Sequence, residues 1–303
     1  MSFTSTVKSE VSKLNTIESE NITELSAIIK NNAIEENKIK IVTENASLAR
    51  RIFKLIKDLY DINSKIVVRK VYNYNKNLLY IIEISHKKDL IINDTCTNKN
   101  IPDEYLVSDN ELKRAYLRGL FLATGSINDP KKSRYHLECI VNNEEYAIYI
   151  SNLKNEFNLN SKVLKRDNKY MIYIKEAEKI GDFLRIINAS NAVMYFEDMR
   201  IYRDHKNMIN RLNNCEQANV DKMIEAANKQ INDINTIIEI SGLDVLDEKE
   251  QIVAEYRLKY KDVSLLELSE IISIETGKQI TKSGINHRIK KIAQIAERMR
   301  NIK

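Results

Sequence analysis

Apolar residues recur at helical spacing in several segments of the chain. Within residues 46–59, Leu48, Ile52, Leu55 and Leu59 follow one another at intervals of three or four, which places them on one face of a helix. Similar spacing predicts further helices over residues 3–14, 21–32, 112–124, 144–157, 176–187, 191–214 and 217–240. Runs rich in Ile, Val and Tyr between polar turns predict strands over residues 64–72, 78–85, 134–141, 160–166 and 170–175. The pattern predicts an α+β fold.

The order of the predicted elements occurs twice, over about residues 1–90 and 108–190, with a polar connection between them. The letters NSKIV at 63–67 return as NSKVL at 160–164, each time at the start of a strand that follows a helix. LSAII at 25–29 likewise aligns with LRGLF at 117–121. A diverged internal duplication explains both observations. Chance similarity in a chain rich in Ile, Asn and Lys is the alternative.

The predicted helix at 112–124 carries small residues along one face. Ser108 and Glu111 have the spacing of a capping box at its start. Ala115, Gly119 and Ala123 follow at intervals of four. Because a helix-interior Gly costs about 0.5–1 kcal/mol relative to Ala, close contact with a second helix is expected to offset it. The corresponding positions of the first repeat, Thr23, Ala27 and Asn31, predict that the two equivalent helices pack on each other.

The segment LRGLFLATG at 117–125, which ends at Gly125, resembles the helix motif of the LAGLIDADG homing endonucleases. The longer run 113–130 is similar to the WhiA family, which joins a degenerate LAGLIDADG-like domain to a C-terminal helix-turn-helix. The resemblance continues through YHLE at 135–138, NNCE at 213–216 and TKSGINHR at 281–288. It implies a duplicated LAGLIDADG-like domain followed by an all-α helix-turn-helix domain.

The residue at the eighth position of each motif indicates whether nuclease activity is retained. The endonucleases have an acid there, and the two acids hold divalent metal for phosphodiester cleavage. This chain has Asn32 and Thr124 at those positions, and neither supplies the carboxylate that Mg²⁺ prefers. Nearby Asp129 stands in the turn-forming sequence NDPK. We therefore expect no metal, no cofactor and no enzymatic activity.

The composition and the absence of certain motifs exclude further classes of protein. The 303 residues include only 6 Gly and 2 Pro, and no Gly lies in a phosphate-binding GxGxxG or GxxxxGK[ST] motif. Cys96, Cys139 and Cys215 form no CxxC pair, so neither a zinc site nor a disulfide framework is expected. The charged N-terminus and the lack of a long apolar run predict a cytoplasmic protein without membrane contact.

Charge is polarised within the last 63 residues, 241–303. Residues 276–303 hold eight basic side chains and one acidic side chain, whereas 241–275 hold four basic and nine acidic. Ser264 and Glu267 form a capping-box pattern before one helix, and a second helix starts near Ser283 after a turn at 275–278. One basic helix after a short turn is typical of a helix-turn-helix.

We therefore divide the chain into a LAGLIDADG-like domain at 1–214, a connecting helix at 215–240 and a DNA-binding domain at 241–303, with its motif at about 264–298. The N-terminal end of the basic helix is expected to meet base edges, and its later residues phosphate. The residues at the base edges are Lys282, Ser283, Asn286 and His287, and those near phosphate are Arg288, Lys290 and Lys291. The basic strand residues Lys65, Arg69, Lys162 and Arg166 fit either a DNA-gripping saddle or an ordinary surface.

The expected function is sequence-specific binding of double-stranded DNA without catalysis, by a nucleoid-associated regulator. The WhiA resemblance implies a bacterial role in cell division and chromosome segregation, and in sporulation among actinomycetes. An active endonuclease is one alternative, and a scaffold whose basic helix binds protein is another. Other transcription regulators or cell-division proteins are open as partners, and the oligomeric state is open too.

Overall fold

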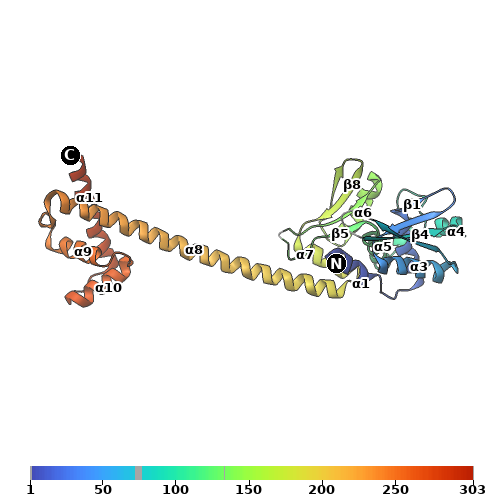
Figure 1. Ribbon diagram of the computed structural model, residues 1–303, viewed down its shortest axis with the longest axis horizontal. Coiled ribbons are helices and arrows are strands. Elements are labelled where there is room, and N and C mark those ends of the chain that lie inside the picture. Colours follow the sequence, from blue (N-terminus) through green and yellow to red (C-terminus); the bar gives the residue numbers. More distant parts are fainter. Residues whose placement is uncertain (1, 72–76, 133, 303) are drawn as a thin grey trace. The chain divides into compact units, whose positions relative to one another are not determined.

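The computed structural model describes residues 2–71, 77–132 and 134–302, and the chain forms two compact units, residues 1–204 and 205–303. In Figure 1 the first unit runs from blue to yellow and the second continues to red. Among the described residues, no helix is both long enough and apolar enough to cross a membrane. The turn expected near 73–77 and the end of the predicted strand 64–72 lie largely outside the described residues.

In the described residues, the first repeat begins with helix α1 and continues through two further helices and four strands. Its elements are α1 (Phe3–Val11), α2 (Glu18–Lys30), β1 (Ala33–Ile34), β2 (Ile39–Thr43), α3 (Ala46–Tyr60), β3 (Lys65–Val71) and β4 (Asn77–Ile84). Asn45 caps α3 by accepting from the backbone N–H groups of Ser47 and Leu48. The strands form an antiparallel sheet in the order β1-β2-β4-β3, and α3 packs on β2 and β4.

The second repeat has the same topology. A connection with α4 (Lys88–Asp94) and the 3₁₀ helix η1 (Glu104–Val107) leads to it. Its elements are α5 (Asn110–Thr124), β5 (Gly125–Ile127), β6 (Leu137–Val141), α6 (Glu144–Glu156), β7 (Lys162–Arg166) and β8 (Lys169–Ile174), followed by α7 (Ala177–Ile186). Its strand order, β5-β6-β8-β7, repeats that of the first sheet. The cross-strand row Lys40–Glu83–Lys65 corresponds in register to Glu138–Tyr173–Lys162, as the predicted duplication requires.

Helices α2 and α5 pack against each other with almost no side chain between them. A Cβ added at Gly119 would lie 2.3 Å from the carbonyl oxygen of Glu24 and 2.9 Å from the Cβ of Ala27. Ala115 and Ala27 are fully buried, while Ala123 is partly exposed. The small residues therefore bring the two backbones into direct contact, as their four-residue spacing predicts.

A buried carboxylate ties three helices together beside this contact. Glu24 on α2 accepts from Arg118 Nε of α5 at 2.7 Å and from Arg51 Nε of α3 at 3.0 Å, and all three side chains are at least nine-tenths buried. Arg118 also pairs with Glu20 at 3.1 Å. Two acids and two guanidinium groups balance in charge, which keeps the cost of burying them low.

The second unit contains the later part of α8 (Ser190–Ser241), η2 (Leu243–Val245), α9 (Glu248–Lys259), α10 (Leu265–Thr276) and α11 (Lys282–Ile302). The segments expected at 191–214 and 217–240 are one continuous helix, α8, because no Gly or Pro lies between them to end it. At its start, the Glu10 carboxylate accepts from the backbone N–H groups of Asn191 and Ala192 at 2.7 and 3.0 Å. Gly242, with φ of +77°, follows its end.

The structure differs from the sequence prediction at several short elements. β1, β2, β5, α4 and α9 were not expected. The cap of α5 was assigned to Ser108, but Asp109 is the N-cap residue, and its carboxylate accepts from Leu112 N–H at 2.9 Å. The interpretation of Ser108 and Glu111 as a capping box was therefore wrong.

We expect Gly119→Ala to lower the free energy of unfolding by about 2–3 kcal/mol, because the new Cβ would meet a backbone carbonyl that cannot turn away. Gly181→Ala on α7 is the control, since the nearest atom to its added Cβ is the flexible Oε1 of Glu197. That variant should differ from the parent by less than about 1 kcal/mol, because the gain from replacing a helix-interior Gly offsets the displacement of the carboxylate. Urea unfolding followed by circular dichroism measures both, and equal stability of the two variants would contradict the close contact.

Glu24→Gln should destabilise the first unit by about 3 kcal/mol, because it leaves two buried guanidinium groups without their shared charge. Glu111→Gln removes the acid of an exposed ion pair with Arg114 at 3.2 Å and should cost below about 1 kcal/mol. The same denaturation experiment compares them. A small effect of Glu24→Gln would show that the network adds little to stability.

Candidate nucleic-acid interface

The second unit is built around one apolar core to which each of its long helices contributes. Ile234 and Ile237 of α8, Val253 of α9 and Leu268 of α10 are fully or almost fully buried. From α11 the core receives Ile285, Ile289, Ile292 and Ala296. Their spacing fixes the rotation of α11, so that its opposite face is turned to solvent.

The turn between α10 and α11 is held by side chains as well as by backbone. Gly277 ends α10 in the left-handed conformation, with φ of +67°. The Ser273 hydroxyl accepts from Ile280 N–H at 3.0 Å, which ties the turn back to α10. Thr281 Oγ1 then accepts from Gly284 N–H at 3.1 Å at the start of α11. These bonds set two helices at the short separation of a helix-turn-helix.

The N-terminal cap of α10 is the predicted capping box. Ser264 Oγ accepts from Glu267 N–H at 3.2 Å, and the Glu267 carboxylate accepts from Ser264 N–H at 2.7 Å. The bond from the Ser264 backbone lowers the pKa of the Glu267 carboxyl. Both partners of the capping box therefore have the roles that their spacing predicts.

Five of the predicted DNA-binding residues lie on the solvent face of α11. Within the described parts of the chain, their side chains are exposed and make no hydrogen bond or ion pair to protein. They are Lys282, Ser283, Asn286, His287 and Lys290. This face carries two ammonium groups, an amide, a hydroxyl and an imidazole, all free to bind an external partner.

Arg288 and Lys291 lie elsewhere on the helix. Arg288 is half-buried beside a cavity of about 250 Å³ that Ile272 and Lys278 also line. Lys291 Nζ lies 3.3 Å from Glu250 Oε1 and 4.0 Å from Asp247 Oδ2, at the capped start of α9. A backbone bond from Glu250 is the main cause that lowers the pKa of Asp247. A phosphate contact by Lys291 would have to compete with this pairing.

Two features of this surface were not predicted from the sequence. Gln294 is exposed four residues after Lys290 and seven after His287, so it continues the same face. Its position at helical spacing was the available signal. Helix α9 was also missed, although Asp247 and Glu250 form a complete capping box before it.

The sheets of the first unit present a different kind of surface. Exposed Val42, buried Ile81 and half-buried Val67 form a cross-strand row on the face opposite Ile41 and Ile82. Ile140, Met171 and Leu164 form the equivalent row in the second sheet. The basic residues Lys65, Arg69, Lys162 and Arg166 are exposed around these apolar rows. Apolar rows offer few donors to phosphate or base edges.

The former metal positions are occupied by side chains that hydrogen-bond to nearby backbone groups. Asn32 donates to the Ile28 carbonyl at 2.8 Å and accepts from Val42 N–H at 3.2 Å. Thr124 donates to the Leu120 carbonyl at 3.2 Å. Within the described ranges, no group of three or more His, Cys, Asp and Glu residues has an arrangement that could hold a metal ion.

Sequence models of three domains match the chain. The WhiA N-terminal LAGLIDADG-like domain matches residues 18–96, and the WhiA LAGLIDADG-like domain matches residues 113–206. The WhiA C-terminal HTH domain matches residues 209–296. Together they confirm the predicted fold class: two LAGLIDADG-like repeats followed by a helix-turn-helix domain.

Individual relatives resemble the chain over its length. The "Probable cell division protein WhiA" of Oceanobacillus iheyensis is 44% identical, and the alignment covers 99% of this chain and 98% of that protein. The protein of the same name from Bacillus cytotoxicus is 45% identical with the same coverage. The crystal structure of full-length DUF199/WhiA from Thermatoga maritima matches with a TM-score of 0.58 and 27% identity, covering 98% of this chain and 99% of that one. The chain therefore belongs to the WhiA family.

Proposed function

We propose that this protein is a sequence-specific DNA-binding regulator without catalytic activity. The observation that carries the proposal is the solvent face of α11, where five polar side chains are exposed without protein partners on the second helix of a helix-turn-helix. In such motifs this helix enters the major groove with its N-terminal residues at the base edges.

The residue types on α11 suit the reading of bases. Asn286 can form two hydrogen bonds to adenine, and Lys282 can donate to the acceptors of guanine. Lys290 lies two turns beyond Lys282, where an ammonium group suits a backbone phosphate. Arg288 and Lys291 are also proposed to contact phosphate, but their side chains are less available than that of Lys290. Arg288 is half-buried, and Lys291 is paired with Glu250.

The non-catalytic assignment rests on the bonding of Asn32 and Thr124. An amide and a hydroxyl that hydrogen-bond to the backbone supply no negative charge for a divalent cation. Neither residue has the carboxylate that LAGLIDADG cleavage would require.

The biological role follows from the names of the relatives. Two relatives that are 44–45% identical are called probable cell division proteins, so a role in cell division is proposed here as well. A regulator that binds the chromosome would be cytoplasmic and nucleoid-associated, and chromosome segregation is the finer role that we propose. The rival function, a scaffold that binds protein through α11, predicts no affinity of that helix for duplex DNA.

DNA binding should depend on Lys290 in a salt-dependent way. We would select duplexes from a random library with the full-length protein and measure retardation of the enriched duplex at several salt concentrations. The affinity falls as salt rises, so the slope of log affinity against log salt is negative. Lys290→Ala should reduce the magnitude of this slope by about 0.9, the value for one lost phosphate contact. Lys222→Ala removes an exposed charge from α8 and should leave the slope unchanged.

Different results would separate the alternatives. If the library yields no common sequence, binding is not sequence-specific. If the protein fails to retard DNA at all, the scaffold function is favoured. Equal slopes for the Lys290 and Lys222 variants would show that the face of α11 defined above does not contact the backbone.

No cleavage is expected when the full-length protein is incubated with the enriched duplex and Mg²⁺ or Mn²⁺. The products would be resolved on a denaturing gel beside a sample that contains EDTA. Cuts at a fixed position that need the metal would contradict the non-catalytic assignment and favour the endonuclease.

A further inference from the structure

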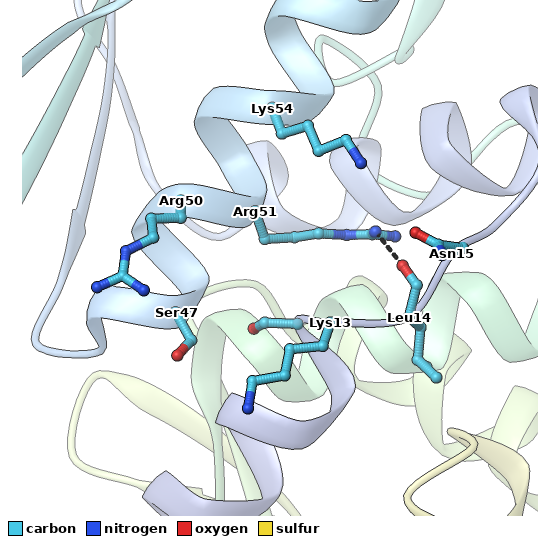
Figure 2. Close-up of a pocket in the computed structure, with 8 residues that line it drawn as sticks. Lys13, Leu14, Asn15, Ser47, Arg50, Arg51 and Lys54 are labelled. Carbon is cyan, nitrogen blue, oxygen red and sulfur yellow. Dashed lines mark hydrogen bonds between the residues drawn. The ribbon is translucent and has the colours of Figure 1, made fainter.

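A basic cavity of about 270 Å³ lies between α3 and the loop that follows α1. Figure 2 shows the Arg51 side chain crossing this cavity toward the Leu14 carbonyl, with Lys54 on one side of it and Lys13 and Ser47 on the other. The polar residues that line it are Ser12, Lys13, Asn15, Ser47, Arg50, Arg51 and Lys54. Among the described residues, no acidic side chain lines it.

The donors of this cavity are available to a ligand. Within the described ranges, the side chains of Lys13, Arg50 and Lys54 make no ion pair or hydrogen bond, and neither do the side-chain groups of Asn15 and Ser47. The start of α3 is already capped by Asn45, so the cavity does not depend on free N–H groups of a helix end. Three unpaired cations in one concave site attract an anion.

Arg51 adds a donor from the buried side. Its side chain is 7% exposed and carries five N–H groups. Glu24, Thr16 and Asn21 accept from Nε and Nη2, and the Leu14 carbonyl accepts from Nη1. Nη1 has two N–H groups and one acceptor in the described part of the chain, so one N–H remains available to a ligand.

We propose that this cavity binds the phosphate dianion of a small molecule. A dianion matches several unpaired cations better than a carboxylate does, and guanidinium and ammonium groups form their strongest hydrogen bonds to phosphate oxygens. The volume is slightly below that of cavities that bury drug-sized ligands, about 300–1,000 Å³, which suits a phosphate on a small carrier.

The site is distinct from the proposed DNA-binding surface. Its lining comes from α3 and the loop between α1 and α2, whereas the proposed DNA contacts are on α11. Because Arg51 also bonds to Glu24, and Glu24 to Arg118, a ligand here would touch the same side-chain network that joins α3 to α2 and α5.

The test is equilibrium dialysis of the full-length protein with radiolabelled inorganic phosphate, at pH 8 and constant ionic strength. We expect saturable binding of one phosphate per chain. The double variant Arg50→Ala/Lys54→Ala should weaken it by about 10- to 100-fold, the effect of losing charge-assisted hydrogen bonds. Lys57→Ala removes an exposed charge from the same helix outside the cavity and should bind within about twofold of the parent.

Glycerol 3-phosphate as a competitor identifies the source of the dianion. Tighter binding than inorganic phosphate assigns the site to an organic monoester, and equal or weaker binding assigns it to phosphate itself. Both results support the site.

Three results would overturn the proposal. Phosphate binding without saturation would indicate only general attraction to basic residues. An equal loss in Lys57→Ala would point to the same conclusion. Absence of phosphate binding would also contradict it, and if the double variant then weakens DNA retardation, the cavity contacts the DNA backbone and not a small ligand.

Discussion

The first unit depends on the contact between the backbone of α2 and the backbone of α5 at Gly119. The glycine leaves room for the Glu24 carbonyl, and this approach places the Glu24 side chain within reach of Arg118 on the facing helix. Each helix leads directly into the first strand of its own sheet, at β1 and at β5. The separation of the two helices therefore determines where both sheets begin, and the buried ion pairs resist any change in it.

Spacing in the sequence was enough to predict the features that depend on neighbours along the chain. The small residues at 115, 119 and 123, the Ser264–Glu267 capping box and the basic helix all follow local rules, and the structure has them. The five exposed residues of α11 could be placed on one face for the same reason. Two-residue β1 was not predictable, because Ala33 and Ile34 are too few to show an alternating pattern before they pair with β2.

The features that escaped prediction depend on contacts distant in sequence. Nothing near Arg51 or Arg118 indicates that both share Glu24, since the three residues meet only after α2, α3 and α5 have packed. The pairing of Lys291 with Glu250 likewise forms only when α9 packs against α11. The sequence before α9 contains several acidic residues, so the capping pair Asp247 and Glu250 does not stand out. The apolar rows on the sheets cannot be identified without the strand register, which places Val42 beside Ile81 and Ile140 beside Met171.

The glycine at the helix contact is present in only one of the two repeats. Helix α5 has Gly119 where α2 has Ala27, so two copies of α2 facing each other would place a methyl group where a carbonyl now lies. The halves have become complementary and can no longer replace each other. A gene for the first half alone could not encode a symmetric pair with this contact without further mutation.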